Sequence, residues 1–157
     1  MGKYYEADES IKNLVDDLVD NRFRNLAAAT IKVIMYSKPK IDKLRGAMVF
    51  ASIKPANQVE RYLSKNGYNL DGVDYLIFVN DLVWELANLT DRKRILSHEL
   101  RHAFIDDKGN YKVVNHDIED FFDEVTLNKD DPMWGQALST IAMAKYEQMK
   151  ADAKSKK

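Results

Sequence analysis

SHELRH, residues 97–102, is the stretch around which the rest of this chain is organised. His98 and His102 flank Glu99 in the order H-E-x-x-H. On a helix, residues four positions apart lie on one face, about 6 Å apart along the axis. The two imidazoles can therefore bind one metal ion, and Glu99 can reach a water molecule on that ion. This order is the signature of zinc proteases, in which both histidines are ligands and the glutamate is the general base.

A surface helix that carries two solvated histidines is the alternative interpretation of this motif. Two observations favour a metal site. The third and last histidine of the chain, His116, follows within the same part of the sequence. The motif is also flanked by an apolar stripe opposite the histidines, which is typical of a helix packed on a core. The stripe consists of Leu96, Leu100, Ala103 and Phe104.

The composition predicts one globular domain over residues 1–157, because 45% hydrophobic and 31% charged residues are ordinary values. The net charge of −1 provides no general attraction to nucleic acid or to a membrane surface. The absence of cysteine excludes disulfides, a thiol nucleophile and cysteine-bound zinc, so a metal must be held by histidines and carboxylates. No run has the length of a signal or membrane segment, and we expect a cytoplasmic protein.

The hydrophobic pattern predicts an α+β domain, in which a small mixed β-sheet packs on the central H-E-x-x-H helix with further helices beside it. Helices are expected at 9–21, 56–65, 81–86, 91–105, 116–127 and 132–150. Strands are expected at 29–36, 47–53 and 74–80, and a short extended piece at 111–114 follows the polar turn 106–110. Residues 150–157 are expected to be a disordered basic tail.

Several local signals refine this outline. The strands 29–36 and 47–53, joined by a basic loop, are expected to pair as a hairpin. Pro55 is suited to the first turn of helix 56–65, and Asn66-Gly67 to its C-cap. The side chains of this helix expected to face inward are Val59, Tyr62 and Leu63. Thr90 is expected to cap the central helix.

The third metal ligand is the open question of the site, since a catalytic zinc needs three protein ligands and one open position. We expect one zinc ion per chain, with His116 as the third ligand because the turn at Gly109 lets the chain return. Glu119 is the alternative, because His-His-Glu sets also occur in zinc proteases. Asp117, Glu119 or Asp120 could orient an imidazole, or could simply stabilise the start of a helix.

The expected chemistry is peptide hydrolysis by a zinc-activated water. Zinc lowers the pKa of a bound water to about 7 and polarises the scissile carbonyl. Glu99 then takes a proton from the water and passes it to the leaving amine. Tyr111 and Arg101 are candidates for stabilising the oxyanion only because they are near in sequence. An extended substrate could add along a sheet edge at strand 74–80.

Three segments of the chain resemble the family called putative phage metallopeptidases, which is related to Spartan-like and other small zincins. The segments are DYLIFVNDLVWEL (74–86), LSHELRHAF (96–104) and NHDIEDF (115–121). The resemblance spans about residues 9–127 and implies a minimal zincin domain, with zinc bound by His98, His102 and His116 and with Glu99 as base. The chain departs from the family pattern at Ser97, usually Asp, and at Arg101, where a small or thiol residue is frequent.

The leading hypothesis is therefore a zinc metallopeptidase of phage or mobile-element origin that acts on a host protein. One alternative is a Spartan-like protease for DNA-bound proteins, which the absence of a cysteine zinc ribbon and of net positive charge disfavours. Another is a non-catalytic interaction module that binds zinc. The substrate is expected to be a protein or peptide, and the sequence indicates no membrane partner and no particular oligomeric state.

Overall fold

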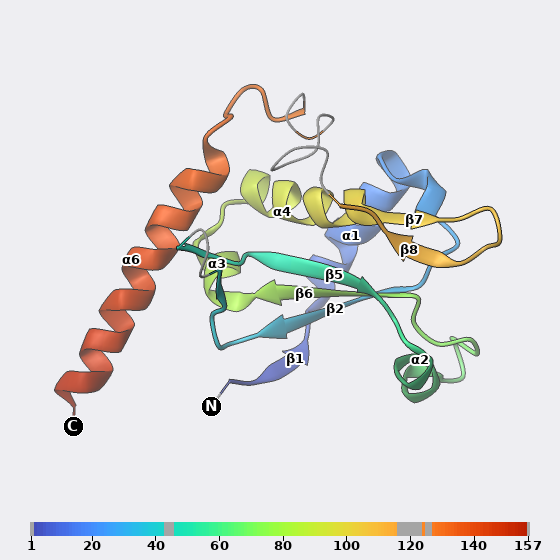
Figure 1. Ribbon diagram of the computed structural model, residues 1–157, viewed down its shortest axis with the longest axis horizontal. Coiled ribbons are helices and arrows are strands. Elements are labelled where there is room, and N and C mark those ends of the chain that lie inside the picture. The colour runs from blue at the N-terminus through green and yellow to red at the C-terminus, as the bar shows by residue number, and fades with distance from the viewer. Residues whose placement is uncertain (1, 43–45, 116–123, 125–126, 157) are drawn as a thin grey trace.

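A mixed β-sheet forms the centre of the computed structural model, which describes residues 2–42, 46–115, 124 and 127–156 (Figure 1). Its strand order is β1-β2-β6-β5. The strands are β1 (Tyr4–Glu6), β2 (Ile31–Tyr36), β6 (Tyr75–Asn80) and β5 (Ala51–Pro55). The two central strands β2 and β6 run parallel, and each edge strand is antiparallel to its neighbour.

Helices and two small strand pairs surround this sheet. The helices are α1 (Glu9–Asn21), the 3-10 turn η1 (Arg24–Leu26), α2 (Gln58–Ser64), α3 (Asp81–Leu86), α4 (Leu89–His102) and α6 (Trp134–Ser155). The pairs are β3 (Ile41–Asp42) with β4 (Ala47–Met48), and β7 (Ala103–Ile105) with β8 (Tyr111–Val113). This content of helices and small sheets agrees with the predicted α+β class.

The main core lies between the sheet and the helices α1 and α4. Alternate side chains of β6 point to this side, as the two-residue period of a strand requires. Tyr75, Ile77 and Val79 are fully buried there, against the apolar faces of α1 and α4. Leu76 and Phe78 belong to a smaller cluster with Ala56 and Val73, on the opposite face of the strand. Both faces of β6 are therefore packed.

A second cluster joins the end of the sheet to the C-terminal helix. Leu138 and Ala142 of α6 are buried against α3, β4 and Ile95 of α4. In Figure 1, α6 crosses the end of the sheet where α3 and β4 lie. The start of α6 is thereby brought close to the middle of α4.

The predicted hairpin between strands 29–36 and 47–53 is wrong. The strand β5 pairs with β6, and β2 pairs with β1 and β6, so β6 lies between the two expected partners. The burial of β6 on both faces explains this, because the most apolar strand is most stable in the centre of a sheet. β5 has only partly buried or exposed residues and forms an edge of the described sheet.

The orientation predicted for helix 56–65 is also wrong. Val59, Tyr62 and Leu63 are 65%, 71% and 74% exposed. The helix begins after Asn57, which forms a capping box with Glu60, so Pro55 belongs to β5 instead. Arg61 faces inward, with its guanidinium 2.6 Å from the Asp74 carboxylate. The expected Asn66-Gly67 cap is absent among the described residues, because the helix ends at Lys65 in an extended conformation.

The central helix α4 begins and ends earlier than predicted. Its N-cap is Asn88, whose side chain accepts the Asp91 N–H, and not Thr90. It ends at His102 because Ala103–Ile105 pairs with β8 as a strand. Phe104, expected on the buried stripe, is consequently 40% exposed. The last helix, α6, extends to Ser155 and so includes most of the segment expected to be a tail.

Candidate metal centre

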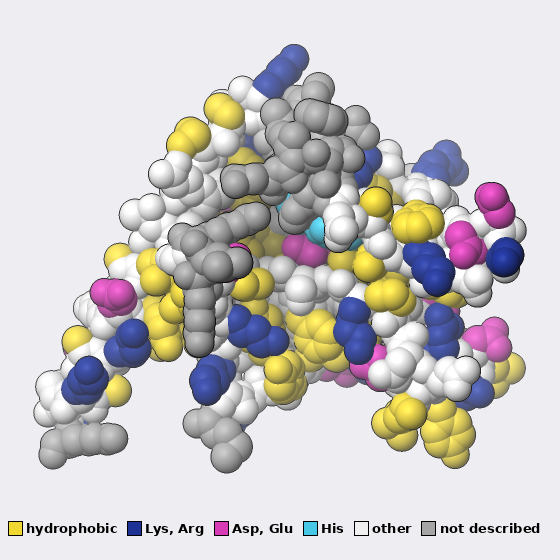
Figure 2. Space-filling model, in the orientation of Figure 1, with side chains coloured by type: hydrophobic (Ala, Val, Ile, Leu, Met, Phe, Trp, Pro, Cys, Tyr) yellow, Lys and Arg dark blue, Asp and Glu magenta, His cyan; other side chains and the backbone are white. Residues whose placement is uncertain are grey.

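A cavity of about 660 Å³ lies between α4 and the edge strand β5. His98, Glu99 and His102 line it from α4, and residues 49–53 line it from β5 and the segment before it. Residues 113–115, Pro132 and residues 134–136 contribute further walls. Figure 2 shows histidine side chains beside an acidic side chain inside this hollow. The three motif residues therefore share one space with a sheet edge.

The two histidines of the motif stand next to each other on one face of α4 near its C-terminal end, as the helical period predicts. Their ring centroids are 5.3 Å apart and the ring planes are inclined by 71°. Both side chains are half-buried and line the cavity. Two imidazoles at this separation can each place a nitrogen at about 2.0–2.1 Å from a common zinc ion.

The backbone of Val114 fixes the orientation of His102. The Nδ1 of His102 lies 2.5 Å from the Val114 carbonyl oxygen, and the Val114 N–H donates to the His102 carbonyl at 2.7 Å. Because a carbonyl oxygen only accepts, Nδ1 must carry the proton. In the neutral ring Nε2 then presents its lone pair, and a hydrogen bond of this kind is typical of metal-binding histidines. These groups fit a zinc ion.

Glu99 lines the same cavity although its side chain is almost fully enclosed. Its residue is 7% exposed. Burial raises the pKa of the Glu99 carboxyl to about 7, and the nearby His98 charge lowers that pKa by a smaller amount. The carboxyl is therefore positioned beside the histidines in a poorly solvated environment, where it can exchange a proton near neutral pH.

The predicted third ligand, His116, and its alternative Glu119 lie outside the described residues, as do Asp117 and Asp120. Within the part of the chain that the structure describes, no group of three or more histidines and carboxylates is suited to a metal ion. The structure thus brings together His98, Glu99 and His102, and the assignment of the third ligand stays a prediction.

Arg101, one of the two oxyanion candidates, takes part in a buried ion pair and does not line the described walls of the cavity. Its partner is Glu124, which is 1% exposed. The Oε1 of Glu124 accepts from Arg101 Nε and Nη2 at 3.2 and 3.0 Å, and from the Ser97 hydroxyl at 2.7 Å. Arg22 donates to the same hydroxyl at 2.9 Å. The two departures from the family pattern, Ser97 and Arg101, therefore bind one carboxylate.

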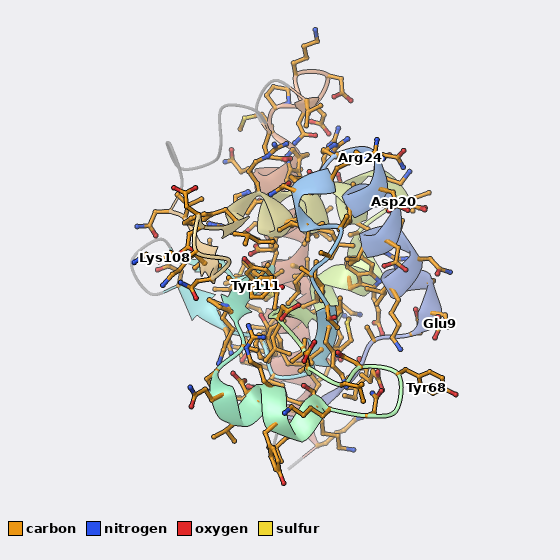
Figure 3. The ribbon with its side chains drawn as sticks, turned by 90° about the vertical axis from the view of Figure 1, so that its right-hand side faces the viewer. Glu9, Asp20, Arg24, Tyr68, Lys108 and Tyr111 are labelled. Atoms are coloured by element: carbon orange, nitrogen blue, oxygen red, sulfur yellow. The ribbon has the colours of Figure 1, made fainter. Side chains whose placement is uncertain are left out.

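Tyr111, the other oxyanion candidate, also does not line the cavity walls that the structure describes. Its ring packs edge-on against Tyr75 with centroids 5.5 Å apart, and the Arg61 guanidinium lies 5.1 Å from its centroid. Figure 3 shows Tyr111 on the inner side of the β7–β8 hairpin, whose turn places Lys108 at the periphery. Both former candidates thus have packing or ion-pair roles.

Sequence reasoning missed the walls of the cavity. Phe50 and Trp134 come from segments far from the motif, and only the tertiary packing of β5 and α6 brings them to it. The available signal for Trp134 was its place near the start of a helix, after Asp131-Pro132. Nothing local in the sequence marked Phe50 as a cavity residue.

Comparison with known proteins gives a family but no individual relative. No curated protein and no solved structure matches the chain. Among the helices that the structure describes, none has the length and apolar character needed to cross a membrane. The family model described as "Putative phage metallopeptidase" matches residues 3–148, nearly the whole chain, and confirms the resemblance predicted from the motifs: the chain belongs to this family.

Proposed function

We propose that this protein is a zinc-dependent metallopeptidase with a minimal zincin-like domain. Its family name implies a metal and a protein or peptide substrate. The observation that carries the proposal is the shared cavity, in which two oriented histidines lie beside a buried glutamate. The hydrogen bond of His102 Nδ1 to Val114 supports ligation through Nε2.

The proposed ligands of a single zinc ion are His98, His102 and His116. The position of Val114 supports the choice of His116. The backbone N–H and carbonyl of Val114 are both bonded to His102, so the chain just before His116 is held beside the motif. His116 follows Val114 by two residues in the sequence. Glu119 is three residues further along the sequence.

The chemistry follows from the donors in the cavity. When bound, zinc acts as a Lewis acid toward a carbonyl oxygen and makes water more acidic. Glu99 accepts the proton of the attacking water and later donates it to the leaving amine. The enclosure of Glu99 supports this role, since a carboxyl kept from bulk water exchanges its proton with the reacting groups.

The substrate is proposed to bind as an extended strand along β5. The sequence suggested strand 74–80 for this role, but that strand is β6 and lies in the centre of the sheet. β5 is an edge strand whose residues 51–53 line the cavity next to His98 and Glu99. Backbone pairing with β5 would give affinity for many sequences. The proposal that the target is a host protein rests on the phage family name alone.

The test compares wild type, Glu99→Gln and His102→Ala for zinc content, thermal unfolding and hydrolysis of a dye-labelled unfolded protein. Glu99→Gln should keep zinc and its melting temperature but lose a factor of roughly 10² to 10⁴ in rate, the usual contribution of a general base. His102→Ala should lose zinc, and with it activity and stability. Loss of zinc in Glu99→Gln would refute the base assignment, and an inactive but zinc-loaded wild type would favour a non-catalytic binding module.

A further inference from the structure

One end of the cavity, on the side of the histidines that faces the start of α4, has mainly apolar walls, although Asp42 and Gln136 also line the cavity. Ile95, one turn before His98, and Met48 of β4 are only 2% and 4% exposed and form its floor. The half-buried side chains Phe50 and Trp134 stand above this floor as walls. All four side chains belong to the cluster that joins α3, α4, β4 and α6. Figure 2 shows hydrophobic side chains on the α6 side of the hollow.

Trp134 is held in place from two directions. Its ring centroid lies 6.3 Å from that of Phe50, with the planes inclined by 50°. The guanidinium carbon of Arg94 lies 5.8 Å from the indole. Arg94 is itself 7% exposed and is bonded to Asp91 and Asp130, at 2.9 and 3.1 Å. An indole fixed in this way forms a rigid wall, which favours discrimination by shape.

We propose that this apolar end is a specificity subsite that takes one large aliphatic or aromatic substrate side chain next to the scissile bond. The inference rests on the proposed function. A peptide paired with β5 presents alternate side chains toward the cavity, and one of them would lie against the wall formed by Phe50 and Trp134. A well-fitted apolar subsite changes kcat/KM by a factor of roughly 10 to 200 for a small difference in side-chain size.

Gly135 offers a way to fill the subsite without disturbing the fold. It lines the cavity beside Trp134, and a Cβ atom placed on it would meet nothing within 4 Å beyond its two chain neighbours and the nearby backbone of its own helix. A larger side chain at this position therefore extends into open space in the first turn of α6. Gly135→Leu should reduce the room for a substrate side chain, whereas Gly135→Ala should leave most of it.

The experiment digests a mixed peptide library with the zinc-loaded enzyme and identifies the residues on both sides of each cut by mass spectrometry. Matched peptides with Phe, Leu or Ala at the selected position then give kcat/KM. Wild type should prefer Phe or Leu over Ala by a factor of roughly 10 to 200. Trp134→Ala should lose most of this preference, and Gly135→Leu should shift it toward Ala. Ile141→Ala, a truncation at a 54% exposed position of the same helix, should behave like wild type.

A binding measurement separates the failure of this inference from the failure of the proposed function. Phenylalanine hydroxamate and alanine hydroxamate both present a metal-binding group and differ only in the side chain. The zinc-loaded protein should bind the phenylalanine compound at least tenfold more tightly, and Gly135→Leu should abolish the difference. If no peptide is cut but this ratio is found, the peptidase proposal fails and the subsite stands. Equal affinities, cleavage without apolar preference, or no binding of either compound would overturn the inference.

Discussion

Replacing Arg101 by Met tests whether the buried carboxylate of Glu124, which contacts α4, needs its positive partner. Arg101 Nε and Nη2 donate to Glu124 Oε1 at 3.2 and 3.0 Å. The Glu124 side chain is 1% exposed, and its Oε2 has no hydrogen-bond partner among the described residues. Among the described residues, the Ser97 hydroxyl alone would then remain on this carboxylate, at 2.7 Å. Met keeps most of the apolar stem that packs on Phe23, whose ring centroid is 4.6 Å from the guanidinium.

The expected cost is about 3–5 kcal/mol in the free energy of unfolding, the typical effect of removing one partner from a buried ion pair. For a chain of 157 residues, each kcal/mol changes the melting temperature by roughly 2–4 °C. Arg101→Met should therefore unfold about 6–20 °C below wild type. The loss arises mainly from leaving Glu124 charged and unpaired, since the net stability of the intact pair is small.

Urea denaturation of the metal-free protein measures this cost without a contribution from zinc binding. The matched control is Arg24→Met, because the Arg24 side chain is exposed on η1 (Figure 3) and should change stability by less than about 0.5 kcal/mol. Adding Glu124→Gln to Arg101→Met should recover at least half of the loss, because the buried charge is then gone. A loss below about 1 kcal/mol in Arg101→Met, or no recovery in the double variant, would refute the reasoning.

Two further predictions concern the supports of α4 and of the β7–β8 hairpin. Tyr75→Phe should cost about 1–3 kcal/mol, because the buried Tyr75 hydroxyl bonds to the Phe104 carbonyl at 2.7 Å and accepts the Lys112 N–H at 3.1 Å. Thermal unfolding would measure this loss of stability, with Tyr68→Phe as a control at a fully exposed position. Equal melting temperatures for Tyr75→Phe and Tyr68→Phe would contradict the prediction. Asn88→Ala should cost about 0.5–2 kcal/mol in the free energy of unfolding, because it removes the N-cap of α4. Asn88→Asp should retain the stability of wild type, since Asp can also cap a helix. If the urea midpoints of the two variants do not follow this order, Asn88 does not act as a cap.

The sequence predicted those elements whose signal is local and strong. The helix 9–21 has the predicted bounds, because its apolar residues repeat with the helical period; the Asp8 cap is seen only in the structure. Strand 74–80 was found as β6, because a dense apolar run of that length is typical of a buried strand. The pair of His98 and His102 follows from helical spacing alone, and its position beside Glu99 needed no knowledge of the rest of the fold.

Features that depend on distant contacts were missed. β1 is only three residues long and exposed, so no periodicity marks it, and it is ordered through pairing with β2. The hairpin prediction failed because strand pairing is decided by which strand can be buried on both faces. The apolar face of α2 was assigned inward from its period, whereas the ion pair of Arg61 with Asp74 fixes the opposite orientation. Trp134 reaches the cavity, and Glu124 reaches Ser97 and Arg101 of α4, only through tertiary packing.

The residue at which α4 ends determines how the second histidine of the candidate metal site is oriented. His102 lies in the last turn of the helix and His98 about one turn before it, near the negative end of the helix dipole, which favours a cation. The helix cannot continue, because Ala103 turns into β7, and the hairpin then returns the chain so that Val114 bonds to His102. Had α4 continued to residue 105, as its apolar pattern suggested, this pairing of Ala103–Ile105 would be lost. The strand that interrupts the predicted helix is therefore what orients the second histidine, and the H-E-x-x-H motif alone does not contain that information.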